Sequence, residues 1–386
     1  MKVLNLAGVA PSTVFSHVPL SNALRNAGHQ VMVTVSNEEL IQTIVGVGLP
    51  AVRVTDPDRT IQEIISRGEP VNVPEDPVER ERMAGRWYAR LEAATLDALL
   101  AFAKDWRPDV IVGGMQSFAA PLLATRLGLP WVRHAWDIHD SGLMDAGAND
   151  DLSDQLAELG LDRFPEPDMM IDITPPSLRL PDAAPAQMMR WIPGNAQCRL
   201  DRWMYAKDAE TRIGVTVGTG VKNYNQYDFL DGIVKNVSTL DAEVAVAVTE
   251  DAAPEMRERL NNTRVGWVPL DVLAPTCDVL VHQSGGSTMM TALSFGVPQV
   301  LIPDPGLHRA NVMARRVVEA GAGIMISPKE ATTEAVAKAC QEIITNPDYA
   351  AAASGLAQEI AALPLPSEVA RRVEWLVHDA SRGRRD

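Results

Sequence analysis

Short runs of apolar and β-branched residues recur along the chain, and a segment with the apolar spacing of a helix follows each of them. The runs lack the period-2 alternation of a strand with one solvated face, so they predict strands buried on both faces of a parallel sheet. Strands that alternate with helices in this way predict right-handed βαβ units. The predicted strands of the first half cover residues 3–8, 30–35, 51–54, 109–113 and 131–136. Those of the second half cover residues 212–218, 243–249, 264–268, 278–283, 298–303 and 323–326.

Glycines and prolines divide this pattern into two comparable halves. Helices are predicted over residues 17–27 and 288–295, each followed by a glycine that ends it. The Pro-rich residues 174–202 predict a stiff, extended linker, and the domain boundary is expected near residue 205. Residues 56–89 lack strand signals and predict a surface helix in an insertion that shapes a pocket. Residues 367–386 predict a final amphipathic helix.

Length and composition agree with two globular domains, and the net charge excludes some classes of binding partner. The chain has 386 residues, 46% of them hydrophobic and 22% charged, and its net charge is −15. This charge argues against binding to nucleic acid or to an anionic membrane surface, both of which need a basic face. The chain shows no signal peptide and no apolar run long enough to span a membrane, so a cytoplasmic protein is expected.

The strongest candidate site is a turn that follows the predicted strand at residues 278–283. His282 ends the strand, and Gly285, Gly286, Ser287 and Thr288 lead directly into a helix. Free amides and hydroxyls at such a helix start suit a phosphate or diphosphate, to which His282 could donate a further hydrogen bond. An ordinary turn with a Ser or Thr helix cap explains the same spacing equally well.

A second glycine turn, Gly218-Thr219-Gly220, follows the first strand of the second half. It departs from the Gly-x-Gly-x-x-Gly fingerprint because Asn223 occupies the third glycine position, and a plain tight turn is the stronger interpretation of it alone. Both turns are expected at the carboxyl ends of strands in one sheet, where open α/β folds bind ligands. Together they favour a nucleotide site in the second half.

The corresponding edge of the first half carries candidate acid–base groups. His17 is predicted at a helix start, where the helix dipole favours the neutral imidazole that a general base requires. A histidine that merely caps the helix is the alternative. Asp137 follows another strand and could orient His17 or accept a proton itself. A metal site formed with His134 and His139 is disfavoured, since strand spacing points these two side chains to opposite faces.

Four motifs in this order give the chain a resemblance to a known family. They are Ser16-His17-Val18-Pro19-Leu20, Ala27-Gly28-His29, Gly266-Trp267-Val268-Pro269-Leu270 and Gly296-Val297-Pro298-Gln299, with a donor-loop segment from residue 281 to residue 293. The chain resembles the GT-B glycosyltransferases that attach nucleotide-activated deoxysugars to polyketide and other antibiotic aglycones. The likeness covers nearly the whole chain.

The resemblance implies two facing Rossmann-like, parallel-sheet α/β domains with a cleft between them. Residues 1–205 would bind the acceptor, residues 206–366 would bind the nucleotide sugar, and residues 367–386 would form a C-terminal crossover helix that packs back on the first domain. The activity implied is an inverting, metal-independent transfer of a deoxysugar from a dTDP- or UDP-sugar to a hydrophobic aglycone, typically an aromatic polyketide. The bond could be O- or C-linked. No cofactor is implied, and a homodimer and an auxiliary activator protein are partners that the family allows.

The family's functional positions can be matched to residues of this chain. His17 and Asp137 would be catalytic, and Ser12, Phe15 and Trp136 would contact the acceptor. Asp304, His308 and Arg309 would bind the donor sugar, although many relatives carry an acid where His308 and Arg309 stand, which favours a deoxygenated or amino-modified sugar here. The donor nucleotide and phosphates would contact Gly218, Thr219, Trp267, Val268, His282, Gly285, Gly286, Ser287 and Thr288.

Two other functions are compatible with such a fold. A nucleotide-sugar epimerase would need acid–base groups in the donor cleft and no acceptor pocket, whereas the insertion at residues 56–89 and His17 favour transfer. A non-catalytic sugar-nucleotide-binding helper subunit is the second alternative, and the intact donor loop and His17 count against it.

Overall fold

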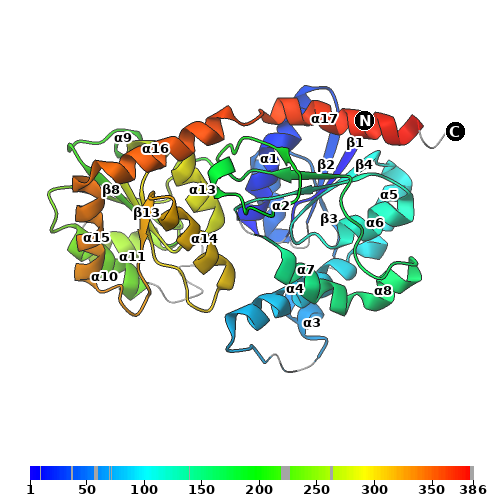
Figure 1. The fold of residues 1–386 in the computed structure, drawn as a ribbon, viewed down its shortest axis with the longest axis horizontal. Helices are drawn as coiled ribbons and strands as arrows, with labels where there is room; N and C mark the ends of the chain where they lie inside the picture. Colours follow the sequence, from blue (N-terminus) through cyan, green and yellow to red (C-terminus); the bar gives the residue numbers. More distant parts are fainter. Residues whose placement is uncertain are drawn as a thin grey trace.

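The computed structural model describes residues 1–8, 10–35, 38–55, 60–68, 70, 72–138, 140–218, 227–260 and 264–382. Two α/β units lie beside each other, and the last two helices run across both of them (Figure 1). The doubly buried strands predicted from the apolar runs are confirmed, since β1 (Lys2–Leu6) and β4 (Val110–Gly114) are buried almost throughout. Each unit therefore has its own sheet with helices on both faces.

The first domain is built on a parallel sheet of seven strands within the described residues, in the order β3-β2-β1-β4-β5-β6-β7. Its other strands are β2 (Gln30–Val35), β3 (Ala51–Arg53), β5 (Trp131–His134), β6 (Met169–Asp172) and β7 (Gln187–Met188). Its helices are α1 (Pro11–Asn26), α2 (Glu38–Gly46), α3 (Ile61–Ser66), α4 (Pro77–Ala93), α5 (Leu96–Trp106), α6 (Ala119–Leu127), α7 (Gly142–Asp151) and α8 (Ser153–Glu158).

The second domain has a parallel sheet of six described strands in the order β10-β9-β8-β11-β12-β13. They are β8 (Arg212–Thr216), β9 (Glu243–Ala247), β10 (Val265–Gly266), β11 (Val279–His282), β12 (Gln299–Leu301) and β13 (Gly323–Met325). The helices are α9 (Arg202–Tyr205), α10 (Tyr227–Val237), α11 (Ala253–Leu260), α12 (Leu270–Leu273), α13 (Gly286–Ser294), α14 (His308–Glu319), α15 (Thr333–Thr345), α16 (Pro347–Ala362) and α17 (Pro366–Arg382).

The predicted linker at residues 174–202 needs correction, because part of it belongs to the first sheet. Gln187 and Met188 pair in parallel with Ile171 and Asp172 and form the edge strand β7. Its neighbour β6 was also missed by the sequence pattern, because Ile171 is the one β-branched residue in its sequence Met-Met-Ile-Asp. The flanking prolines fit this position, because an edge strand tolerates residues that cannot donate to the ladder.

The predicted start of the first helix at His17 is also wrong. Helix α1 begins at Pro11, which occupies its first turn, and Ala10 precedes it in an extended conformation. Proline suits this place because the amide it lacks would have no partner inside the helix. His17 therefore lies in the second turn of α1, beyond the reach of the free amides at the helix start.

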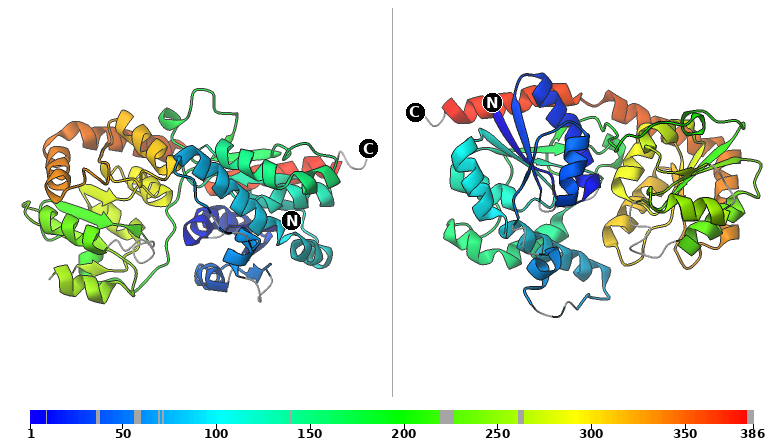
Figure 2. Two further views of the ribbon diagram at one scale, coloured as in Figure 1. Left: turned by 90° about the horizontal axis from the view of Figure 1, so that it is seen from below. Right: turned by 180° about the vertical axis from the view of Figure 1, so that it is seen from behind.

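The crossover helix expected at the C-terminus is α17. It continues from α16 over the second domain and runs along the outside of the first domain, as the right view of Figure 2 shows. Its apolar face buries Val369, Ala370 and Val373, and it packs against α1. Glu374 contacts the imidazole of His29, directly after α1. The chain end therefore ties the two domains together.

Helices α4 and α7 cross in direct backbone contact below the first sheet (Figure 1). A Cβ atom at Gly85 of α4 would overlap the carbonyl oxygen of Met144 in α7. A Cβ atom at Gly147 of α7 would in turn overlap the carbonyl oxygen of Arg82 in α4. The two glycines thus allow an approach that no other residue pair permits. This approach fixes α4, which forms much of the predicted insertion.

Glu92, near the end of α4, makes the free energy of unfolding depend on pH. Burial raises the pKa of its carboxyl to about 8, against the effect of a hydrogen bond from the Ala119 amide. A raised folded-state pKa means stability that is present below the unfolded pKa and is lost as pH rises through the folded value. Between about pH 4.5 and pH 8 the parent protein should lose stability as the pH rises, whereas Glu92→Gln has no carboxyl to titrate here. The difference in unfolding free energy in favour of Glu92→Gln should therefore grow by about 1.4 kcal/mol per pH unit. Urea unfolding of both proteins at several pH values measures this, and a constant difference would contradict it.

None of the helices in the described ranges has the length and apolarity that crossing a membrane requires.

Candidate active site

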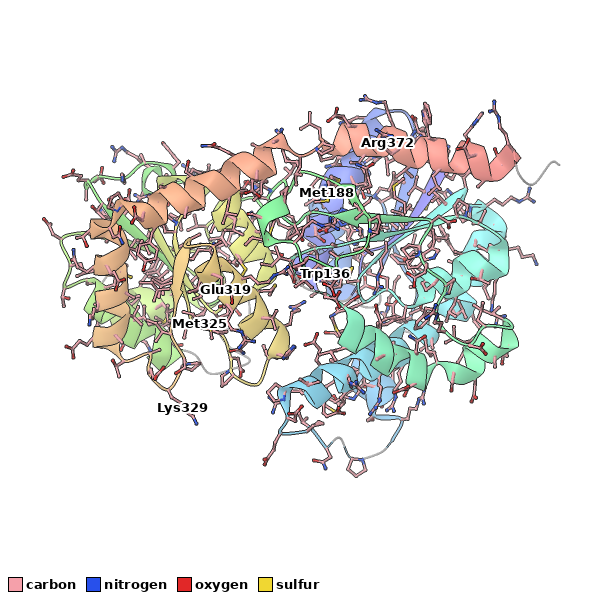
Figure 3. All side chains as sticks on the ribbon, in the orientation of Figure 1. Trp136, Met188, Glu319, Met325, Lys329 and Arg372 are labelled. Carbon is pink, nitrogen blue, oxygen red and sulfur yellow. The ribbon has the colours of Figure 1, made fainter. Side chains whose placement is uncertain are left out.

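A cavity of about 300 Å³ opens between the two domains, and both of them line it. The first domain contributes the start of α1, Tyr88 of α4 and the segment after β5. Figure 3 shows Trp136 of that segment where the first domain faces the second. The second domain contributes the carboxyl ends of its strands and the starts of α13 and α14. This is the crevice in which open parallel sheets bind ligands.

Most of the residues predicted as site residues line this one cavity. They are Ser12, Phe15, Trp136, Asp137, Gly218, Trp267, Val268, Gly285, Gly286, Ser287, Thr288 and Arg309. Four predicted residues do not line it: His17, His282, Asp304 and His308. Thr219 lies outside the described residues. The structure therefore joins the acceptor and donor candidates in a single place.

The start of α13 presents free amide groups to the cavity. Gly285 occupies the N-cap position in an extended conformation and has no side chain with which to cap the helix. The first hydrogen bond of the helix runs from Met289 N to Gly285 O, so the amides of Gly286, Ser287 and Thr288 have no partner within it. The equally weighted alternative, a Ser or Thr cap, is thus not what this turn contains. The geometry is that of an anion site.

The predicted phosphate contact from His282 does not fit the structure. Its side chain is buried below the turn, with Nδ1 accepting from the Ser284 amide (3.1 Å) and Nε2 donating to Gln299 Oε1 (2.8 Å). Burial lowers the pKa of this imidazole to about 4, so it is neutral at pH 7. His282 instead supports Ser284, which has a positive φ of 64° that side chains rarely adopt. His282 therefore holds the turn before α13 in place.

Gly218, with which the second glycine turn begins, lies against Gln283 of the first one. Gly218 has a positive φ of 68°, and a Cβ atom there would overlap the side-chain amide of Gln283. Nearby, Trp267 Nε1 donates to Ala196 O (3.0 Å), which holds the segment before α9 against the cavity wall. Gly194 and Asn195 of that segment line the cavity although no sequence motif marked them.

Asp137 crosses from the first domain to the start of α13. A Cβ atom at Gly286 would lie 2.5 Å from Asp137 Oδ2 and 2.6 Å from its Cβ, so the carboxylate rests directly on that backbone. Arg309 Nη1, from the first turn of α14, lies 3.3 Å from the same oxygen. The carboxylate is 4% exposed. A carboxylate of the first domain therefore lies against the first residue of α13 and beside a guanidinium of the second domain.

His17 is enclosed beside the cavity rather than open to it. It is 2% exposed, and neither ring nitrogen has a hydrogen-bond partner among the described residues. Its ring centroid lies 4.8 Å from that of His134, whose Nδ1 contacts Ala135 O. Burial, reinforced by His134, lowers the pKa of His17 well below its usual value. The neutral state predicted for His17 thus arises from burial and not from the dipole of α1.

The loop before α14 is organised by Asp304. Asp304 Oδ1 accepts from the Gly306 amide (2.7 Å), and Asn311 donates to the Asp304 carbonyl (2.7 Å). The guanidinium of Arg80, from α4 of the first domain, lies against Gly306. Arg80 was not predicted, because the contact joins segments that are far apart in the chain.

Among the described residues, no group of three or more His, Cys, Asp or Glu side chains is placed to bind a metal ion.

Two facing parallel-sheet α/β domains, a shared cavity and a crossover helix define the GT-B class of glycosyltransferases. Comparison with known proteins places the chain within that class. The erythromycin biosynthesis protein CIII-like N-terminal domain matches residues 22–218, and the corresponding C-terminal domain matches residues 231–376. The chain belongs to this family of natural-product glycosyltransferases.

Individual relatives are similar over their full lengths. L-demethylnoviosyl transferase of Streptomyces niveus is 32% identical and aligns over 96% of this chain and 97% of its own. Glycosyltransferase SsfS6 of Streptomyces sp. SF2575, solved with thymidine diphosphate, is 34% identical with a TM-score of 0.85, covering 97% and 99%. The spinosyn rhamnosyltransferase SpnG, solved with spinosyn aglycone, is 25% identical with a TM-score of 0.83, covering 97% and 100%. The two-domain parallel-sheet fold predicted from the sequence is confirmed.

Proposed function

We propose that this glycosyltransferase moves a deoxysugar from a thymidine diphosphate sugar to a hydrophobic aglycone, with inversion at the anomeric carbon and without a metal ion. The observation that carries the proposal is the start of α13 in the shared cavity, where Asp137 of the first domain lies against Gly286. The name of the Streptomyces niveus relative and the thymidine diphosphate bound to SsfS6 support this choice of donor. The aglycone bound to SpnG supports an acceptor of that kind.

The donor would bind to the second domain through its diphosphate. The amides of Gly286, Ser287 and Thr288 are donors that point along a helix axis, and they favour negative charge without a cation. Charge develops on the diphosphate as the sugar–oxygen bond breaks, so these amides stabilise the leaving group. Val268 and Trp267 line the same cavity and would enclose the base.

The acceptor would bind against the first domain. Phe15, Trp136 and Tyr88 present aromatic surface to the cavity, which suits a flat aromatic polyketide. The nucleophile, a phenolic or alcoholic oxygen or a ring carbon beside a phenol, must then lie within reach of a base. Both domains of a single chain supply all these groups, so the scheme requires neither a homodimer nor an auxiliary protein.

Asp137 is the base that the geometry favours. It lines the cavity, whereas His17 does not line it and makes no hydrogen bond through its ring nitrogens within the described part of the chain. The acceptor proton would pass to the carboxylate while the new bond to the anomeric carbon forms on the face opposite the diphosphate. Attack from that face inverts the configuration. His17 would support the wall of the site next to Trp136.

Titration calorimetry tests the donor half of this proposal. We expect thymidine diphosphate to bind the full chain with a dissociation constant in the micromolar range, about −8 kcal/mol. Uridine diphosphate should bind more weakly, and addition of a metal chelator should change neither affinity. Binding of NAD without binding of either nucleoside diphosphate would contradict the proposal.

A further inference from the structure

Asp137 rests on a surface that the proposed donor also needs. The carboxylate touches Gly286 at the start of α13 and pairs with Arg309 of α14. A Cβ atom at position 286 would lie 2.5 Å from the carboxylate oxygen, so the carboxylate fills the space beside the first residue of α13. A diphosphate on the neighbouring amides would place its negative charge next to this carboxylate, and the two anions would repel each other.

The groups that hold Asp137 form a small cationic patch. The positive end of the α13 dipole and the Arg309 guanidinium approach the carboxylate from the second domain. A second arginine of α14, Arg316, donates to the carbonyl oxygen of the next residue, Ile138. The segment after β5 is thus fastened to the second domain, although its chain belongs to the first.

We propose that the Asp137 carboxylate and the donor diphosphate compete for this patch, so that donor binding displaces Asp137 toward the acceptor. The inference rests on the proposed function, because it assumes a diphosphate at the start of α13. The exchange replaces one anion by another at Arg309 and the helix amides. The displaced carboxylate then takes the acceptor proton as the sugar–acceptor bond forms and the sugar–diphosphate bond breaks. Arg309 is a positioning residue that couples donor binding to the base.

Because of this competition, removing the charge of Asp137 should strengthen donor binding, whereas removing an ordinary binding residue weakens it. Asparagine keeps the shape of Asp137 and removes its charge, so Asp137→Asn should bind thymidine diphosphate more tightly while transferring sugar more slowly. We expect the dissociation constant to fall about fivefold or more, within the usual range for coupling between two sites. The KM for the donor should fall together with kcat. A merely structural role for Asp137 would weaken donor binding instead.

The experiment is a calorimetric titration of the full chain with thymidine diphosphate and, separately, with thymidine. Asp137→Asn should tighten the diphosphate and leave thymidine unchanged, because only the phosphates compete with the carboxylate. Asp140→Asn is the matched control, since it removes a neighbouring exposed charge that accepts a hydrogen bond from the Gly142 amide. It should change the affinity by less than about twofold, as expected for an exposed charge.

A double-mutant cycle identifies the shared group. In an Arg309→Gln background, Asp137→Asn should tighten thymidine diphosphate less than it does in the parent protein, because one of the contested groups is gone. Unchanged or weaker binding by Asp137→Asn, an equal gain for thymidine, or an equal gain for Asp140→Asn would each overturn the inference. If the parent protein itself fails to bind thymidine diphosphate, the proposed function fails instead.

Discussion

Replacing Asp137 by asparagine is expected to lower kcat for sugar transfer by about 10²–10⁴-fold, the usual contribution of a general base. The physical reason is that asparagine cannot accept the acceptor proton at neutral pH. The carboxylate is the acidic side chain that the structure places against the start of α13 within the shared cavity. Initial rates of glycoside formation at saturating donor and acceptor measure the effect.

His17 provides the contrast for this prediction. Its ring nitrogens are buried and make no hydrogen bond to the residues that the structure describes, so His17→Gln should reduce kcat by less than about tenfold, well below the loss of a base. If His17→Gln abolishes transfer while Asp137→Asn retains it, the base is His17 and the assignment made from the geometry is wrong.

Replacing either crossing glycine by alanine should destabilise the protein by about 3 kcal/mol, the upper part of the range for overpacked sites. A methyl group at Gly85 or Gly147 meets a backbone carbonyl oxygen of the facing helix, which cannot rotate away as a side chain could. Helices α4 and α7 would have to separate. Because α4 carries Tyr88 to the cavity, the KM for the acceptor should rise as well. Denaturant unfolding and steady-state kinetics check the two effects.

Gly355 supplies the matched control for this substitution. It also lies within a helix, α16, but a Cβ atom there would have no neighbour within 4 Å. Gly355→Ala should therefore stabilise the protein by up to about 1 kcal/mol, as helix propensity predicts. Equal losses at Gly85 and Gly355 would show that the helix crossing is not the cause.

Local patterns predicted much of the fold because doubly buried strands leave a signal in the sequence. The apolar runs located β8 and β11. The glycines that follow these strands, Gly218, Gly285 and Gly286, identified the part of the cavity that the second domain lines. Strand β7 escaped because two residues between prolines carry no periodicity, and they pair only because β6 lies beside them. The edge strand of the first sheet is therefore set by tertiary contacts, which a local sequence pattern does not contain.

The chemistry at individual side chains was less predictable. The sequence placed His282 at the right strand end, but only the structure shows that Ser284 and Gln299 occupy both of its nitrogens. Likewise, no local sequence pattern predicts that Asp137 contacts Gly286 and Arg309 of the other domain. Such contacts depend on how the two domains face each other.

Inverting, metal-independent sugar transfer is tested most directly by proton NMR of a reaction that contains the full chain, a thymidine diphosphate deoxysugar, an aromatic polyketide and a metal chelator. We expect thymidine diphosphate and a glycoside to form in equal amounts, and only when the acceptor is present. The glycoside should have the anomeric configuration opposite to that of the donor. Conversion of the donor to an epimer without acceptor, or a glycoside with retained configuration, would contradict it.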